Sequence, residues 1–166
     1  MVKDEWLTPP PILAALGPFD LDPCAPIVRP WDMAREHYTV EDNGLLKPWK
    51  GRVWLNPPYG PPPIVGPWMR RMVQHNRGMA LIFARTETEL FFETVWQSAR
   101  AVLFVQGRLY FHHVDGTRAA ANSGAPSVLI AYGDEDAEIL RACAIPGHFV
   151  RLDKQPARAI AISGLF

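Results

Sequence analysis

The sequence has little cysteine, no long apolar run and no excess of charge, and each shortage excludes a class of protein. Its two cysteines, Cys24 and Cys143, form no Cys-x-x-Cys pair, which argues against a disulfide framework and a cysteine-based zinc site. The longest apolar run, Met79 to Ala84, is too short to span a membrane. The charged N-terminus lacks the apolar region of a signal peptide. We therefore expect a cytoplasmic protein in a reducing compartment, with no membrane partner.

Charge of one sign is not in excess overall, but it is unevenly distributed. The 17 basic residues balance 17 acidic ones, and 48% of the chain is apolar, so the protein is neither a polycation nor a disordered tail. Residues 1–42 hold three basic and eight acidic residues, whereas residues 43–133 hold ten basic and four acidic. A positive middle region suits a phosphate backbone, and an acidic first third suits a small cationic cofactor. Chance unevenness on a solvated surface is the alternative.

Proline, in contrast, is abundant. The 17 prolines are about twice the average usage, and they cluster at 9–11, 57–58 and 61–63 between periodic segments. We interpret these prolines as marking loops between packed helices and strands. The sequence contains no repeat and no linker long enough to divide 166 residues, so we expect one domain over residues 1–166.

Predicted helices and strands alternate over the first 100 residues. The pair Thr8-Pro9, a hydroxyl cap followed by proline, predicts a helix over 9–16. Apolar residues at helical spacing from Val65 to Val73 predict a second helix, and a capping box over 86–89 predicts a third that continues to about residue 99. Strands are predicted over 19–22, 52–55, 79–84, 101–105, 109–113 and 127–132, and a last helix over 134–142. This order predicts an α/β sandwich with a mainly parallel sheet and an antiparallel C-terminal edge.

The segment Asn56-Pro57-Pro58-Tyr59 is the most informative motif, because it directly follows a predicted buried strand. Prolines fix φ and remove N–H donors, so nearby carbonyls are free to face a ligand. The Asn56 carboxamide oxygen and a neighbouring carbonyl make a pair of acceptors suited to the two N–H bonds of a conjugated amine, whose lone pair they would direct. Tyr59 offers a flat face on which a flipped-out base can stack. A proline-rich turn with a packed tyrosine is the structural alternative.

In its context, this motif resembles the compact phage-type (Dam-like) DNA N6-adenine methyltransferases. The resemblance covers about residues 5–132 and rests on Trp6-x-Thr8-Pro9, Phe19-Asp20-Leu21-Asp22-Pro23-Cys24-Ala25, Tyr38-Thr39, Glu41-Asp42-Asn43-Gly44-Leu45, Pro48-Trp49-x-Gly51-x-Val53 to Gly60, Pro67-Trp68, Arg85-Thr86-x-Thr88 and Gly107-Arg108-x-x-Phe111. It implies a Rossmann-like methyltransferase sandwich without a separate target-recognition domain. It also implies methyl transfer from S-adenosylmethionine to the exocyclic amine of a flipped-out adenine by direct in-line attack, for instance to shield a phage genome from restriction in the host cytoplasm.

The resemblance assigns roles to individual positions. The catalytic segment would be Asn56, Pro57, Pro58 and Tyr59, with Asn56 and the Pro57 carbonyl accepting from the target amine and Tyr59 stacking on the base. The cofactor-binding residues would be Thr8, Pro9, Asp22, Pro23, Cys24, Ala25, Asp42 and Asn43, with Glu36 as the candidate for the cofactor ribose. Independently, arginines that suit phosphate contacts are Arg70, Arg71, Arg108 and Arg118. No metal is expected.

Two departures and several alternatives accompany this interpretation. No glycine lies between Asp22 and Pro26, where methyltransferases generally have a glycine-rich turn. The stretch from Pro26 to Lys50 is short for two βα units, which predicts an abbreviated sheet or mostly loop. Methylation of cytosine N4 or of protein glutamine, and a methyltransferase-like module that binds DNA or cofactor without turnover, are alternative functions. A metal-dependent nuclease that uses Asp20 and Asp22 is a further one.

Overall fold

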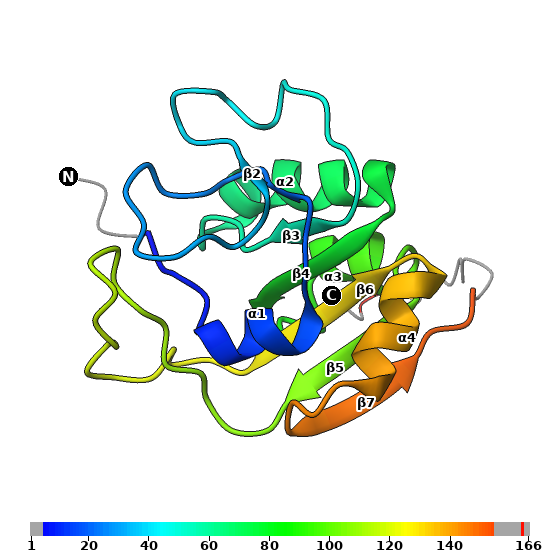
Figure 1. The fold of residues 1–166 in the computed structure, drawn as a ribbon. Coiled ribbons are helices and arrows are strands. Elements are labelled where there is room, and N and C mark those ends of the chain that lie inside the picture. The colour runs from blue at the N-terminus through cyan, green and yellow to red at the C-terminus, as the bar shows by residue number, and fades with distance from the viewer. Residues whose placement is uncertain (1–4, 155–163, 165–166) are drawn as a thin grey trace.

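The protein, in a computed structural model that describes residues 5–154 and 164, contains one sheet with helices on both of its faces (Figure 1). The helical segments are α1 (Pro10–Leu16), α2 (Pro62–His75), α3 (Glu89–Phe91) with the π-helical turn η1 (Phe92–Trp96), and α4 (Asp134–Ala142). The strands are β1 (Leu21–Asp22), β2 (Glu36–His37), β3 (Val53–Leu55), β4 (Gly78–Phe83), β5 (Ala101–Val105), β6 (Ser127–Tyr132) and β7 (Gly147–Arg151). The predicted α/β class is confirmed.

The strands lie in the order β2-β1-β3-β4-β6-β5-β7. The pairs β2–β1, β1–β3 and β3–β4 are parallel. The pairs β4–β6, β6–β5 and β5–β7 are antiparallel, so β5 runs in the same direction as the parallel group. The sheet thus has the predicted antiparallel C-terminal edge, and the carboxyl ends of β1, β3, β4 and β5 lie along one edge.

Side-chain alternation along the central strands builds two cores. In β4, Met79 and Leu81 pack with Leu16 of α1 and Leu140 of α4 on one face. On the other face, Ala80 and Ile82 pack with side chains of α2, α3 and η1. Because β4 is buried on both sides, it appears in the sequence as a continuous apolar run. Within residues 5–154, no helix combines the length and the apolarity that crossing a bilayer requires.

Two predicted helix caps are wrong. The helix α1 begins at Pro10, one residue later than predicted, and Thr8 does not cap it. The Thr8 hydroxyl instead accepts a hydrogen bond from Trp54 Nε1 at 3.2 Å. The third helix is capped by Thr88, not by Thr86, and ends in the π-helical turn before residue 99. The indole of Trp96 donates to the carbonyl of Thr86 at 3.0 Å, which accounts for Thr86 staying outside the helix.

The predicted strand over 109–113 is also wrong. It is part of a long connection from β5 to β6, in which His112 forms only isolated bridges, to Leu7 and to Arg118. Residues 117–123 fold back beside it and donate to the carbonyls of Phe111 and Leu109, but this irregular hairpin forms no regular ladder and does not join the sheet. The short strands β2 and β7 were not predicted: β2 has only two residues, and β7 is an exposed edge strand. Between Pro26 and Lys50 only β2 is regular, so the prediction of an abbreviated, mostly looped region is confirmed.

A buried ion pair joins the start of β3 to both helices on its face. Arg52 donates to Asp136 Oδ1 of α4 through Nε and Nη2, at 3.0 and 2.7 Å. Its remaining donors bond to the carbonyls of Pro18 and Leu16, at 2.8 and 3.0 Å. Both charged side chains are almost fully buried. This cluster fixes β3, and with it the segment that follows β3.

Candidate active site

The candidate site lies where β1 and β3 end. The two strands are paired in parallel, so Asp22 at the end of β1 and Asn56 just after β3 reach the same edge of the sheet, as predicted. A pocket of about 540 Å³ opens there. Its lining comes from Glu5 and Trp6, residues 23–26, Thr39 and Val40, Asn43 and Gly44, the segment Asn56–Tyr59, and Ile64 and Trp68. The sequence motif therefore forms one wall of a pocket.

The Asn56 side chain is held in one orientation. Its Nδ2 donates to the backbone carbonyl of Trp6 at 3.0 Å, and its Oδ1 accepts from the Tyr59 hydroxyl at 3.0 Å. The backbone carbonyl of Asn56 accepts from the Cys24 thiol at 3.3 Å. Because the Trp6 carbonyl requires an N–H donor, this contact fixes which side-chain atom of Asn56 is the nitrogen and which is the oxygen. The side-chain oxygen is thereby directed toward Tyr59.

Tyr59 is packed among aromatic side chains. Its ring stacks on Phe83 with centroids 4.4 Å apart, and Phe111 meets it edge-on at 5.7 Å. Burial raises the pKa of Tyr59 far above its usual value, so the hydroxyl remains a donor to Asn56. The ring also borders a smaller hollow of about 210 Å³ beside Trp6 and Asn122.

Asp22 is buried beneath the pocket, with only 3% of its surface exposed. Burial raises its pKa to about 7, although the backbone N–H of Cys24, at 3.0 Å, and the charge of Arg29 favour the ionised form. Asp22 shares a very small void with Thr8, Trp54 and Asn56. A carboxyl group that is half-ionised near neutral pH will favour a cationic ligand, which stabilises the charged form.

Gly44 packs against the turn after Asp22, which itself contains no glycine. A Cβ at Gly44 would lie 1.9 Å from the Pro23 carbonyl oxygen, so only glycine fits there. The Trp49 indole donates to the Gly44 carbonyl at 2.8 Å, and the Ala25 N–H donates to the Tyr38 carbonyl at 2.9 Å. The close backbone packing at this turn thus comes from the segment 38–51.

The predicted cofactor residues do not all lie together. Pro23, Cys24, Ala25 and Asn43 line the 540 Å³ pocket, and Thr8 and Asp22 line the void next to it. Pro9 lines a different hollow. Glu36 forms an exposed ion pair with Lys50 at 2.8 Å. Asp42 is bonded to Lys47 and to the Thr39 N–H, at 2.8 and 2.9 Å, and like Glu36 it is not part of the pocket wall.

Sequence reasoning missed several residues of the site. Trp6 contributes through its backbone carbonyl, which no residue type reveals. Ile64 and Trp68 are one helical turn apart at the start of α2 and line the pocket. Their spacing directly after the motif was a signal that could have identified them.

The four predicted DNA-binding arginines fall into two groups. On α2, Arg70 makes a bidentate pair with Glu93 at 2.8 and 2.9 Å, and Arg71 lies over the Trp49 ring at 4.9 Å. In the connection between β5 and β6, Arg108 and Arg118 line one hollow. Arg70 and Arg71 are therefore more fully engaged by contacts within the protein than Arg108 and Arg118.

The residues proposed for a nuclease metal site have separate partners. Asp20 Oδ2 accepts from the Arg52 N–H at 2.7 Å, whereas Asp22 accepts from Cys24. The part of the chain that the structure describes contains no group of three His, Cys, Asp or Glu side chains placed to hold a metal ion. The geometry gives the nuclease hypothesis no support.

Comparison with known proteins agrees with the motif. Residues 1–142 match the model of the family described as DNA N-6-adenine-methyltransferase (Dam). A DNA N-6-adenine-methyltransferase of Escherichia phage T1 is 29% identical over 126 residues, which cover 72% of this chain and 51% of that relative. The chain thus spans about half the length of the curated relative it matches. No solved structure matches the chain. Since the family match extends over most of its length, the chain belongs to the DNA N-6-adenine-methyltransferase (Dam) family.

Proposed function

We propose that the protein methylates the N6 amine of adenine in DNA, with S-adenosylmethionine as the methyl donor. One observation carries the proposal: Asn56 lies at the carboxyl end of β3, on a pocket wall, with its side-chain oxygen held in a fixed direction. Family membership supports the same activity. Both the donor and DNA are intracellular, so the proposal includes a cytoplasmic setting.

The pocket fits the proposed cofactor in size and chemistry. Its volume of about 540 Å³ lies within the usual range for small-molecule sites. Pro23, Cys24, Ala25 and Asn43 would hold the cofactor, and Asp22 below them favours a cation. When bound, S-adenosylmethionine supplies an electrophilic methyl group, which the adenine amine takes by direct in-line displacement.

The residues of the motif position the amine. Asn56 Oδ1 and the Pro57 carbonyl accept its two N–H bonds, which directs the nitrogen lone pair. Tyr59 already donates to Asn56 Oδ1, and the second lone pair of this oxygen is available to the adenine N–H. The Tyr59 ring then stacks on the flipped base. The methylated amine is acidic and releases its extra proton to water, so no strong base is required.

The fold supports a Rossmann-like methyltransferase formed by a single domain over residues 1–166. The parallel group β2-β1-β3-β4 has helices on both faces. In such sheets, ligands bind at the carboxyl ends of the strands, where Asp22 and Asn56 lie.

The test is mass spectrometry of nucleosides from the DNA of methylation-deficient cells that express the protein. We expect N6-methyladenine with the unaltered protein and none with Asn56→Ala. Calorimetry should show that Asn56→Ala still binds S-adenosylmethionine. Gln74→Ala is the matched control, because it removes an exposed carboxamide on α2 and should leave methylation unchanged.

Other products would identify another function. N4-methylcytosine, or methylated protein glutamine without a methylated base, would replace adenine as the substrate. Binding of DNA and cofactor without any product would indicate a binding module, and magnesium-dependent cleavage a nuclease. Full activity of Asn56→Ala would refute the proposed mechanism.

A further inference from the structure

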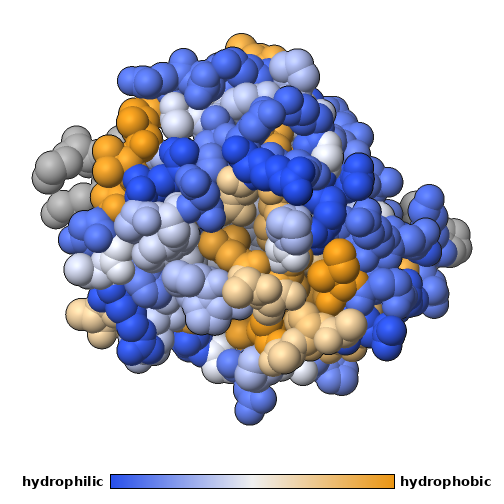
Figure 2. Space-filling model, in the orientation of Figure 1, coloured by the Kyte–Doolittle hydropathy of each residue, from blue (hydrophilic) through white to orange (hydrophobic). Residues whose placement is uncertain are grey.

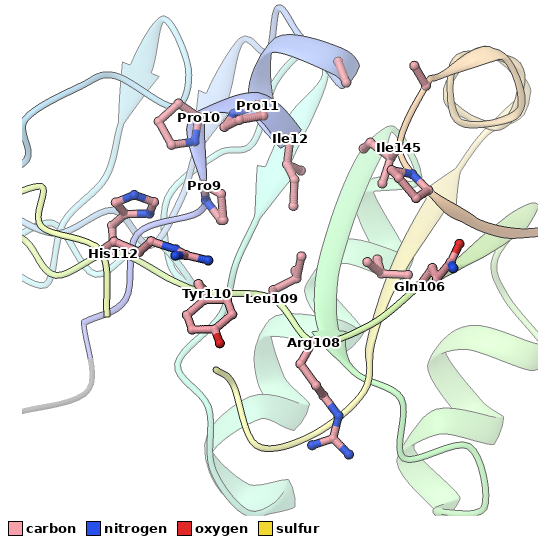
Figure 3. Close-up of a pocket in the computed structure, with 15 residues that line it drawn as sticks. Pro9, Pro10, Pro11, Ile12, Gln106, Arg108, Leu109, Tyr110, His112 and Ile145 are labelled. Carbon is pink, nitrogen blue, oxygen red and sulfur yellow. The ribbon is translucent and has the colours of Figure 1, made fainter. Parts of the chain in front are cut away.

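A second hollow, of about 790 Å³, lies next to the candidate active site, and the proposed mechanism does not use it. Figure 3 shows its two walls: Pro9–Ile12 at the start of α1, and Gln106–Tyr110 with His112 after β5. Ile145 closes one end. The space-filling view shows apolar side chains gathered in the lower half of this face, around the position of α1 (Figure 2). We call this hollow the α1 groove.

The α1 groove adjoins the active site across a few buried residues, although the two hollows share no lining residue. Leu7 and His112 join its two walls through a reciprocal pair of backbone hydrogen bonds at 2.8 and 3.1 Å. Pro9 follows Thr8, which is bonded to Trp54 in β3. Phe111, between two residues of the groove wall, contacts Tyr59 edge-on. A chain whose target group reaches Asn56 would therefore pass along this groove on one side.

The charge of the α1 groove has one sign. Within residues 5–154, Arg108 and Arg118 are its only formally charged lining residues, and no acid lines it. Among the residues described, neither arginine forms an ion pair, whereas Arg70 pairs with Glu93. The Arg118 guanidinium lies 3.8 Å from the Tyr110 ring centroid. The rest of the lining is mostly prolines and aliphatic side chains, with Gln106, Tyr110 and His112, so the groove suits an anionic chain that also has flat apolar groups.

We propose that the α1 groove binds the nucleotides next to the target base as an unstacked single strand. Arg108 and Arg118 contact the phosphates, and bases lie against the prolines, Leu109 and Tyr110. Cationic grooves with aromatic and apolar surfaces bind single-stranded nucleic acid in this way. The inference rests on the proposed function, which makes DNA the substrate. It assigns DNA contact to Arg108 and Arg118 and not to Arg70 and Arg71.

The first test measures DNA binding without turnover. The probe is a fluorescein-labelled single-stranded oligonucleotide of mixed sequence, followed by fluorescence anisotropy over a range of salt concentrations. For Arg108→Gln with Arg118→Gln, we expect at least tenfold weaker binding. Two lost phosphate contacts should also make the slope of log Kd against log salt shallower by about 1.4.

The matched control is Arg77→Gln with Arg100→Gln, which removes the same charge at the opposite edge of the sheet. These arginines precede β4 and β5 and pair with Glu135 and Asp134. Its Kd and salt slope should remain those of the unaltered protein. Equal losses in both double variants would show a general charge effect and overturn the inference.

Photocrosslinking gives a direct readout. Oligonucleotides with 5-iododeoxyuridine near an adenine should crosslink to peptides that contain Tyr110 or His112. Crosslinks only to α2 would overturn the inference, as would a polyglutamate peptide that binds through Arg108 and Arg118 while DNA does not. Normal methylation with unchanged DNA binding in Arg108→Gln, Arg118→Gln would reject the groove but not the proposed function. A protein that neither binds DNA nor methylates it would reject both.

Discussion

Asn56 has its polar atoms engaged before any substrate arrives. Trp6, Tyr59 and Cys24 contact its amide nitrogen, its side-chain oxygen and its backbone carbonyl. Preorganised acceptors need no rearrangement of their own during the reaction. The Tyr59 hydroxyl occupies one lone pair of the Asn56 side-chain oxygen, and the other lone pair remains for the adenine amine.

Removing that hydroxyl should separate its two roles. In Tyr59→Phe the ring can still stack on Phe83, but the hydroxyl that donates to Asn56 Oδ1 is gone. We expect kcat within about threefold of the unaltered protein and an equal or lower KM for DNA. Tyr59→Ala loses base stacking, which contributes about 1–3 kcal/mol, and its kcat/KM should fall roughly 5- to 150-fold. Steady-state methyl transfer measures both, and equal inactivation of the two variants would contradict this account.

The raised pKa of Asp22 predicts that the folded protein loses stability as the pH rises. Its pKa in the folded protein is about 7, whereas that of an unfolded aspartate is about 4. Between these values only the folded state keeps the proton. The free energy of unfolding therefore decreases by about 1.4 kcal/mol for each pH unit, or on the order of 4 kcal/mol in total.

Asn cannot ionise, so Asp22→Asn should remove this slope. The variant should be more stable than the unaltered protein at pH 8 and similar to it at pH 4. Urea denaturation of both proteins from pH 4 to pH 8 measures the difference. If the difference in the free energy of unfolding between the two proteins does not change with pH, Asp22 is not the source of the pH dependence.

At the level of elements, the segment 38–51 is held against the turn after β1 by Gly44. In Gly44→Ala the new Cβ would overlap the Pro23 carbonyl, and the segment must move. We expect a loss of about 1–3 kcal/mol of stability, as in other overpacked sites, together with weaker cofactor binding. Urea denaturation and calorimetry measure the two effects.

Gly66→Ala is the contrasting variant. Gly66 lies inside α2, and its Cβ would meet only the flexible end of Arg70 closely. Alanine is favoured over glycine within a helix by about 0.5–1 kcal/mol, but Pro67 follows directly and disfavours a helical residue with a Cβ before it, which offsets part of this gain. Its stability should therefore rise or stay constant, and a loss equal to that of Gly44→Ala would argue against a local clash at Pro23.

Helices and strands with a strong apolar pattern in their own sequence could be predicted from it. Elements that depend on pairing with a distant segment could not. The helices α2 and α4 and the strands β4 and β6 follow periodicity and burial. The segment 109–113 has a strand-like composition but pairs only irregularly with residues 117–123, outside the sheet. Likewise the motif at Asn56 pointed to one wall of the candidate pocket, whereas the contributions of Trp6 and Gly44 depend on backbone atoms brought close only by folding.

At the scale of the whole molecule, Arg52 and Asp136 connect β3, α1 and α4. Removing one partner leaves a buried charge without its counterpart, which typically costs about 3–5 kcal/mol. We expect Arg52→Met to lose this amount in urea denaturation. Replacing both, Arg52→Met with Asp136→Leu, should recover most of it, because neither charge then remains. An equal loss in the double variant would mean that the carbonyl contacts of Arg52 to Leu16 and Pro18 dominate.

The position of β6 has a consequence for how the chain folds during synthesis. β6 lies between β4 and β5 in the sheet but follows both in the sequence. About 40 residues separate Phe83 from Ser127, and ribosomes need several seconds to add them at roughly 5–20 residues per second. Until then, the apolar strand β4 has an open edge, and β5 has no place in the sheet. The nascent chain therefore presents an aggregation-prone edge that chaperones must shield until β6 has emerged.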